Sequence, residues 1–168
     1  NVSSVQFYDP KWLERLNEII EQTGIDRRRL CLEITETTLA QDEEREVEIL
    51  NELRARGVRI SIDDFGIGYS SLGRLKKFPI VHLKVDGSFV RDIAHSADDR
   101  AMTESIITMA HNLGVKVTAE WVETEEQREI VRSFGCDYAQ GYLVSPPLPL
   151  DRFNEFIDRE NRCRRRAA

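Results

Sequence analysis

The chain has 168 residues, of which 40% are apolar and 32% charged, with a mean hydropathy of −0.45 and a net charge of −6. This composition is typical of one soluble domain with a sizeable core. The acidic balance argues against broad binding to duplex DNA, but a small phosphate-bearing ligand is compatible with it if a metal supplies positive charge. No apolar run reaches the ~20 residues of a membrane helix, and the three cysteines form no disulfide framework. We expect a cytoplasmic location, with a membrane-tethered parent protein left open.

Strand-like and helical patterns alternate along the chain. Residues 1–8 are expected to hold a strand end and a loop. The expected strands are then 30–35, 58–63, 81–86, 115–120 and 138–144. The expected helices are 10–23, 42–56, 71–77, 99–113, 124–134 and a last one that ends at Ile157. Thr124 and Gln127 have the spacing of a capping box. In the helix at 99–113, the residues expected to face the core are Met102, Ile106, Met109, Ala110 and Leu113. Residues 158–168 are expected to form a basic tail that is disordered or fraying.

One face of each expected strand is aliphatic and the other is polar. In 58–63, the aliphatic face holds Val58, Ile60 and Ile62 and the polar face holds Arg59, Ser61 and Asp63. An open doubly wound sheet needs apolar residues on both faces, whereas a barrel has helices on the outside only. The pattern therefore predicts an α/β fold, a TIM-like (β/α) barrel with its site at the C-terminal ends of the strands. An open sheet with a solvated polar face is the rival interpretation.

A complete barrel of this kind takes ~250 residues. We therefore expect residues 1–157 to form about the C-terminal two-thirds of a barrel that is incomplete at the N-terminus of this chain.

Acidic residues lie at or near the ends of several expected strands. Glu33, Asp63, Asp64 and Glu120 are candidate metal ligands, because hard divalent cations such as Mg²⁺ and Mn²⁺ prefer oxygen. One of the adjacent aspartates could bridge two ions while the other binds the second, and such a pair activates water against a phosphodiester. Lys84 could orient that water or stabilise phosphate charge, with a plain ion pair to Asp86 as the alternative. The Gly-rich turn over 64–72 is a weaker candidate for anion binding.

These residues stand in motifs that resemble the EAL family of cyclic di-GMP phosphodiesterases. The matching motifs are Asn1-Val-Ser, Leu32-Glu33-Ile34-Thr35-Glu36, Asp63-Asp64-Phe65-Gly66-Ile67-Gly68-Tyr69-Ser70-Ser71-Leu72, Lys84-Val85-Asp86, Ala119-Glu120-Trp121-Val122-Glu123, and Gly135-Cys136-Asp137 continuing to Gln140-Gly141-Tyr142 and Ser145-Pro146. The resemblance implies a TIM-like barrel that hydrolyses cyclic di-GMP to linear pGpG in bacterial signal transduction, with two Mg²⁺ or Mn²⁺ ions.

The resemblance also assigns roles to single residues. It implies that Asn1, Glu33 and Asp63 are ligands of one metal and that Asp63, Asp64 and Glu120 are ligands of the second, with Asp63 bridging.

The resemblance assigns further roles outside these ligands. Lys84 resembles the lysine that contacts the nucleophilic water, and Glu36 the acid that fixes the loop after Asp63–Asp64. That loop is associated with dimerisation, so a homodimer is implied. The further implied substrate or loop positions are Asp86, Gln140, Ser145 and Pro146. A GGDEF or sensory domain is expected elsewhere in the parent chain.

Three features depart from the family pattern. The Glu-Ala-Leu motif that names the family is absent, Trp121 stands where glycine is usual, and Ile67 replaces the usual threonine. These departures keep a second hypothesis open, a catalytically inactive module that binds cyclic di-GMP or a protein. A third is a different barrel enzyme, such as an enolase-like lyase.

Overall fold

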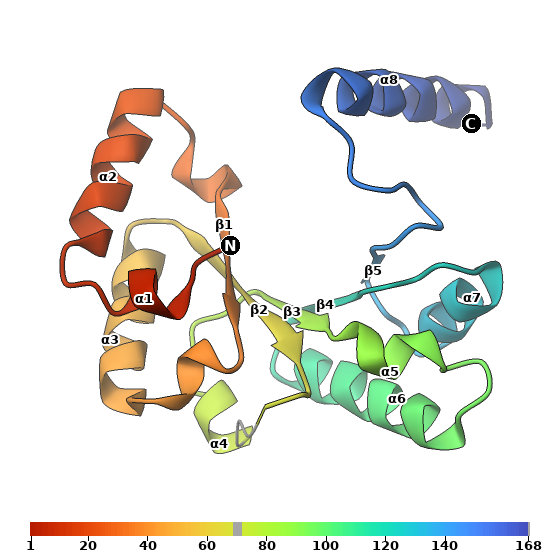
Figure 1. Ribbon diagram of the computed structural model, residues 1–168, viewed down its shortest axis with the longest axis horizontal. Coiled ribbons are helices and arrows are strands. Elements are labelled where there is room, and N and C mark those ends of the chain that lie inside the picture. Colours follow the sequence, from red (N-terminus) through yellow and green to blue (C-terminus); the bar gives the residue numbers. More distant parts are fainter. Residues whose placement is uncertain (69–71, 168) are drawn as a thin grey trace.

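The computed structural model describes residues 1–68 and 72–167, with side chains up to residue 162. Its centre is a parallel sheet in which five strands follow one another in sequence order (Figure 1). The strands are β1 (Cys31–Thr35), β2 (Arg59–Phe65), β3 (His82–Val85), β4 (Lys116–Ala119) and β5 (Tyr138–Ala139). Sequential parallel order, without the reversal of a doubly wound sheet, is the topology of a (β/α) barrel. The expected α/β fold of an incomplete TIM-like barrel is therefore confirmed.

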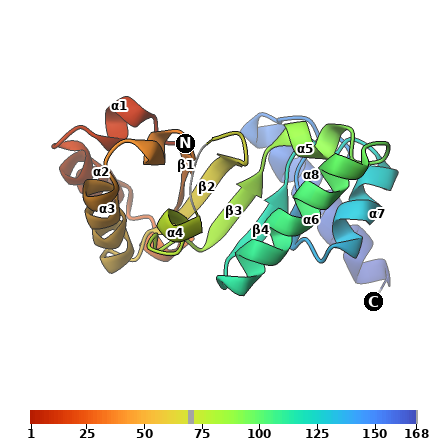
Figure 2. The ribbon, with the colours of Figure 1, turned by 90° about the horizontal axis from the view of Figure 1, so that it is seen from below.

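Helices alternate with the strands along the chain, and some of them cover the aliphatic face of the sheet. They are α1 (Ser4–Phe7), α2 (Trp12–Thr23), α3 (Glu43–Ala55), α4 (Leu72–Leu75), α5 (Gly87–Arg91), α6 (Ala97–Asn112), α7 (Glu125–Ser133) and α8 (Leu150–Ala167), with 3₁₀ turns η1 (Arg27–Arg29) and η2 (Thr38–Ala40). Helix α3 packs on β2, and α6 packs on β3 and β4 (Figure 2). The fully buried residues between these layers include Ile60, Leu83 and Val117. Their burial removes the aliphatic strand face from water, which is the main stabilising term of the fold.

The opposite face of the sheet carries buried polar residues. Ser61, Lys84, Thr118 and Glu120 lie on this face or directly after its strands, and each is more than nine-tenths buried. Polar groups are found so deep only where they are paired or have a function. The alternation of side chains along each strand therefore separates a face that packs against helices from a face that can carry functional groups.

The elements differ from the expected ones in two places, and a third place cannot be compared. The last strand is two residues long instead of the expected 138–144, because the chain leaves the sheet at Gln140. Helix α5, which no expectation covered, follows β3 immediately. Residues 69–71, which contain part of the Gly-rich turn and the expected start of the short helix at 71–77, lie outside the described residues.

The core face of α6 is the expected one only in part, because Ile106 and Ala110 are buried and Met109 packs against the core, as predicted, but Met102 and Leu113 do not. Thr103, Ile106, Ile107 and Ala110 are its buried residues, whereas Met102 and Leu113 are exposed. Ile107 lies in the core and Met102 does not, because the face of α6 that carries Ile107 is the one that packs on β3 and β4. Sequence periodicity did predict the capping box at Thr124 and Gln127, which is present at the start of α7.

The last helix is longer in the structure than the expected one, which ended at Ile157. Helix α8 continues to Ala167, and Figure 1 shows it above the sheet while α6 lies below. The segment contains no glycine or proline, and arginine and glutamate have good helix propensity, so nothing stops the helix at Ile157. Among the described residues, no helix is both long and apolar enough to cross a membrane.

Asp137 attaches β5 to the sheet. Its carboxylate accepts hydrogen bonds from the Val117 amide at 2.9 Å, the His111 ring at 2.9 Å and Lys116 Nζ at 2.5 Å. Burial opposes its ionisation, but these three donors outweigh burial and lower its pKa to about 2. Because the folded pKa lies below the ordinary value of 3.8, the carboxylate stabilises the fold fully above about pH 5. That contribution is lost as the pH falls from about 4 toward 2.

Replacing Asp137 with asparagine is therefore expected to lower the free energy of unfolding by about 2 kcal/mol at pH 7. The difference between the two proteins should shrink to near zero at pH 2. Urea unfolding at pH 7, 4 and 2 measures it. A constant difference across this range would contradict the assignment of the effect to the carboxylate charge.

Candidate functional site

A bulge in β2 places two consecutive aspartates at the same position of the sheet. Ile62 pairs with Leu83 and Phe65 with Val85, so Asp63 and Asp64 together stand opposite Lys84 alone. A bulge of this kind interrupts the alternation of side chains, and here Asp64 has a φ of 52°. Asp is among the few residues that tolerate this left-handed conformation. Both carboxylates can therefore serve one site, which regular strand alternation would not allow.

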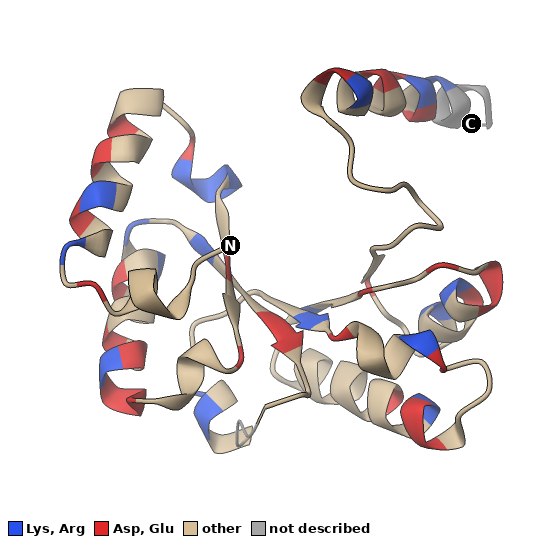
Figure 3. Cartoon of the chain, viewed as in Figure 1, with Lys and Arg blue, Asp and Glu red and all other residues tan. Residues whose placement is uncertain are grey.

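Glu120 completes a cluster of carboxylates with these aspartates. It directly follows β4, and its amide donates to the Val85 carbonyl at 3.2 Å, which places it beside the end of β3. One oxygen each from Asp63, Asp64 and Glu120 lie within 4.8 Å of one another. Figure 3 shows acidic positions at the end of β2 beside a basic position on β3. Three carboxylates this close repel one another unless a cation lies between or beside them.

Lys84 is the cation that the chain provides. Its Nζ lies 2.6 Å from Glu120 Oε1, 2.8 Å from Asp63 Oδ1 and 3.5 Å from Glu33 Oε2. Burial disfavours the charge on Lys84, but the contacts with Asp63 and Glu120 prevail and raise its pKa above the ordinary value. Lys84 is therefore an ammonium ion, able to donate hydrogen bonds and not to take a proton.

One ammonium does not neutralise the whole cluster. Burial raises the pKa of Glu120, although Lys84 opposes the shift. Burial also raises the pKa of Asp64, and the charges of Asp63 and Asp86 add to the shift. The site thus keeps an excess of negative charge that a bound cation would relieve.

Glu33 and Asn1 lie on the same face at the neighbouring strand. The Val2 amide donates to the Glu33 carbonyl at 2.8 Å, and Val2 forms a parallel bridge with Ile34. Both Val2 and Ile34 are buried in the core, so Asn1 and Glu33, one residue earlier on each segment, belong to the opposite, polar face. The structure brings Glu33 to Lys84, while Asn1 is exposed beside it.

Glu36 holds the segment that follows the two aspartates. Its Oε2 accepts from the Gly66 amide at 2.8 Å and from the Gly68 amide at 3.1 Å, and the residue is almost fully buried. Gly66 has a φ of 108°, a conformation that favours glycine. Asp63 is linked to the same region because its carbonyl accepts from the Glu36 amide at 3.0 Å. Glu36 thereby couples the end of β1 to the backbone just beyond the carboxylates.

The other expected site residues lie around the cluster and not in it. Asp86 caps α5 by accepting from the Ser88 amide at 2.9 Å. Ser145 Oγ donates to the Pro146 carbonyl at 2.8 Å, within its own segment. Gln140, Ser145 and Pro146 line a pocket of about 530 Å³ that also includes Glu120. These three residues thus share a cavity with Glu120, one of the three carboxylates of the cluster.

Comparisons with known proteins identify the family of the chain. The family model described as "EAL domain" matches residues 1–147.

The chain belongs to the EAL domain family.

Its curated relatives include the bifunctional diguanylate cyclase/cyclic di-GMP phosphodiesterase MucR of Pseudomonas aeruginosa, 39% identical over 152 residues, which are 90% of this chain and 22% of MucR. The chain thus spans about a fifth of that relative. The solved MucR phosphodiesterase in complex with c-di-GMP has a TM-score of 0.88 at 38% identity and covers 91% of this chain and 62% of that one. The family assignment replaces the enolase-like alternative.

A second solved structure contains a metal ion. Klebsiella pneumoniae BlrP1 in its manganese/cy-diGMP complex has a TM-score of 0.78 at 34% identity, covering 84% of this chain and 36% of that one.

The carboxylates of this EAL domain fit a hard divalent cation. They are all oxygen donors, they carry excess negative charge, and three of them converge within 4.8 Å. Asp63 Oδ1 is buried without a hydrogen bond of good geometry, although Lys84 Nζ lies 2.8 Å away. An oxygen of this kind has a free lone pair for a metal.

The sequence did not predict that aromatic residues line the pocket beside Glu120. Trp121, Tyr142, Phe153 and Phe156 line the pocket that contains Glu120. The last two come from α8, more than thirty residues further along the chain, so no local spacing relates them to the carboxylates. Trp121 was visible as an unusual residue after Glu120, but its position in a pocket depends on the path of the chain after β5.

Proposed function

We propose that this EAL domain hydrolyses cyclic di-GMP to linear pGpG in a metal-dependent reaction. The observation that carries the proposal is the convergence of Asp63, Asp64 and Glu120 around Lys84 at the C-terminal ends of the parallel strands. The names of relatives such as MucR supply the substrate, which the geometry by itself does not specify.

The metal ligands and Lys84 have separate roles at the phosphodiester. When bound, two divalent cations would supply charge compensation on the phosphate and an acidified water molecule. Asp63 would hold both ions, with Asp64 and Glu120 as further ligands of one and Glu33 and Asn1 as further ligands of the other. Lys84 keeps its proton, so it orients the water or stabilises charge that develops on the phosphate.

The ions are proposed to be Mg²⁺ or Mn²⁺. Hard oxygen donors suit both, and the manganese complex of BlrP1 supports the second. Glu36 is proposed as a positioning residue, because it binds the backbone that follows Asp63–Asp64 and thereby fixes where those carboxylates point.

The test is turnover by the full-length protein that contains this chain. We expect pGpG to form with Mg²⁺ or Mn²⁺ and to stop when EDTA is added, as followed by separation of the nucleotides. Absence of pGpG from a protein shown to be folded would refute the proposal. If cyclic di-GMP still bound, and did so unaffected by EDTA, a catalytically inactive binding module would replace the enzyme.

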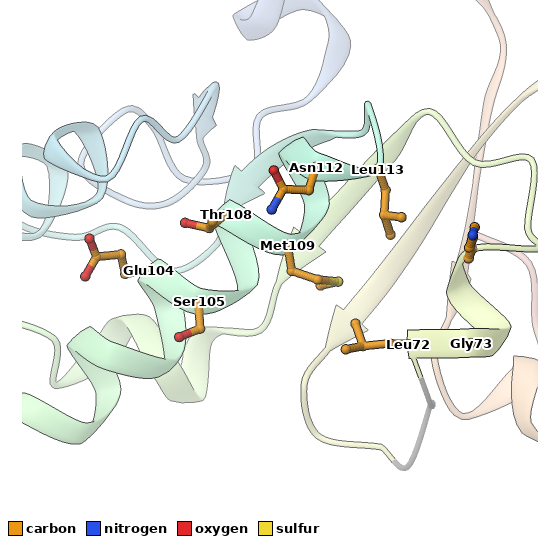
Figure 4. Close-up of a pocket in the computed structure, with 9 residues that line it drawn as sticks. Leu72, Gly73, Glu104, Ser105, Thr108, Met109, Asn112 and Leu113 are labelled. Carbon is orange, nitrogen blue, oxygen red and sulfur yellow. The ribbon is translucent and has the colours of Figure 1, made fainter.

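We further propose a homodimer formed through the loop after Asp63–Asp64 and its surroundings. Ile67 in this loop is 54% exposed, Leu72 at the start of α4 63% and Met102 on α6 47%. Between α4 and α6 lies a hollow of about 740 Å³, and Figure 4 shows Leu72 and Met109 on its two sides. Exposed apolar side chains that border a hollow mark a protein contact, and Glu36 would link that contact to the carboxylates.

Leu72→Glu is therefore expected to weaken the dimer at least tenfold, because it places a charge in an apolar contact. Sedimentation equilibrium measures the effect. Val5→Glu, an equally apolar-to-acidic change on the exposed side of α1, is the matched control and should leave the dimer intact. A wild-type protein that stays monomeric at high concentration would contradict the proposal.

We also propose further domains and a location for the parent protein. MucR is named as bifunctional, and this chain spans 22% of it, which supports a GGDEF or sensory domain in the parent protein. The free thiols of Cys31 and Cys136 support a cytoplasmic location.

A further inference from the structure

Trp121 has a backbone conformation that tryptophan rarely adopts. Its φ is 56°, and among the described non-glycine residues only Asp64 shares a positive φ. Aspartate tolerates this region, whereas the Cβ of a large side chain crowds the neighbouring carbonyl oxygen. Strained residues persist where the surrounding structure holds them and cluster at functional sites. Here both lie at the acidic cluster, since Trp121 directly follows Glu120.

Two neighbours hold the indole in place. Gly87 at the start of α5 packs so closely that a Cβ at that position would overlap the Trp121 ring carbons. The Arg91 guanidinium lies 5.3 Å from the centroid of the ring, a cation–π contact. The indole is therefore positioned by glycine and arginine from the same short helix, α5, which the carboxylate of Asp86 caps.

The rest of the indole is open to solvent and to a pocket. Trp121 is 53% exposed, and it lines the cavity of about 530 Å³ together with Glu120, Gln140 and Tyr142. That volume lies in the range of small-molecule sites. An exposed tryptophan on the wall of such a cavity, fixed by its contacts with Gly87 and Arg91, offers a surface on which a flat ligand can stack.

We propose that Trp121 is a stacking surface for a purine base of the nucleotide substrate, and that it determines how tightly the substrate binds. The inference rests on the proposed function. The phosphate and the base of a nucleotide are separated by one sugar, so a phosphodiester at Glu120 leaves its base beside the next residue. Aromatic rings bind bases through stacking with little regard to hydrogen bonding. Gln140 and the other polar residues of the pocket are then available for the edge of the base.

The first test separates binding from chemistry. Trp121→Gly removes the ring and suits the positive φ, so the fold is expected to survive. For cyclic di-GMP we expect KM to rise roughly tenfold or more, with kcat changed less than threefold. For dimethyl phosphate, a base-free substrate analogue without any aromatic ring, the inhibition constant should change less than threefold. Trp121→Phe, which keeps an aromatic face, should restore most of the affinity.

Three results of this kinetic test would overturn the proposal. An unchanged KM for cyclic di-GMP in Trp121→Gly, or an equal rise in the inhibition constant of dimethyl phosphate, would overturn it. A fall in kcat alone would also overturn it, because that result indicates a role in the chemical step.

A second test does not require turnover. The chain has two tryptophans, and Trp12 is buried in the core, so Trp12→Phe leaves Trp121 as the single indole reporter. Cyclic di-GMP should quench its fluorescence in a saturable manner, and so should GMP at higher concentration, whereas inorganic phosphate should not. Quenching without any hydrolysis would support the stacking role while refuting the proposed enzyme. Binding of cyclic di-GMP detected by calorimetry, with no change in fluorescence, would overturn the stacking role.

Discussion

Asp63→Asn is expected to reduce hydrolysis of cyclic di-GMP by at least about 1,000-fold. Asp63 stands at the centre of the bulge, within 4.8 Å of both neighbouring carboxylates and 2.8 Å from Lys84. The amide has the same shape but no charge, so it can hold a divalent cation only weakly. Because Lys84 keeps its contact with Glu120, the fold should be retained. Steady-state kinetics at saturating Mn²⁺ and circular dichroism measure the two effects.

The matched control for this substitution is Asp98→Asn. Asp98 is an exposed aspartate in the first turn of α6 and has no part in the site. The same chemical change there should leave kcat within twofold of the parent. A folded Asp63→Asn protein that kept more than a tenth of the parent activity would show that Asp63 is not a ligand of the reacting centre.

Lys84→Gln is expected to lower activity at least about 100-fold and to destabilise the metal-free protein by about 3 kcal/mol. The ammonium is the buried partner of Glu120 at 2.6 Å and Asp63 at 2.8 Å. Its removal leaves both carboxylates without a cation. Addition of Mg²⁺ or Mn²⁺ should restore part of the lost stability, since a metal replaces the missing charge, but not the activity. Urea unfolding with EDTA or with metal measures the first effect.

The matched control is Lys77→Gln. Lys77 also forms an ion pair, with Glu43 at 2.5 Å, but its side chain is largely exposed. Water and salt screen such a pair, so the unfolding midpoint should stay close to that of the parent. If Lys84→Gln and Lys77→Gln were equally stable without metal, Lys84 would not be the counter-charge of the cluster.

Much of the fold could be predicted from local patterns in the sequence. The aliphatic alternation of 58–63 predicted a strand with one packed face, and Ile60 and Ile62 are indeed buried beneath the helices. The capping box at Thr124 predicted the start of α7, since capping depends only on residues within one turn. In contrast, the core face of α6 was predicted only in part, because Ile106 and Ala110 are buried whereas Met102 and Leu113 are exposed. Both faces of that helix carry apolar residues, so only contact with β3 and β4 decides which face is buried.

The candidate site could also be predicted from the sequence only in part. Glu33, Asp63, Asp64, Lys84 and Glu120 could be named from the sequence because each lies at or near the end of a strand, and parallel strands end at one edge. The bulge at Asp63 could not be predicted, because it arises from the register between β2 and β3. The distances from Lys84 to its carboxylates have the same origin.

By itself, the sequence determined the family, the order of strands and helices, and which acids could share one edge of the sheet. These follow from residue type and spacing, which act over a few residues or through motifs. The tertiary structure alone decided that a bulge brings Asp63 and Asp64 to one position of the sheet, how far the carboxylates lie from Lys84, and that Trp121 lines a pocket with α8. Each of these depends on segments far apart in the chain, whose contacts are set by packing and not by local preference.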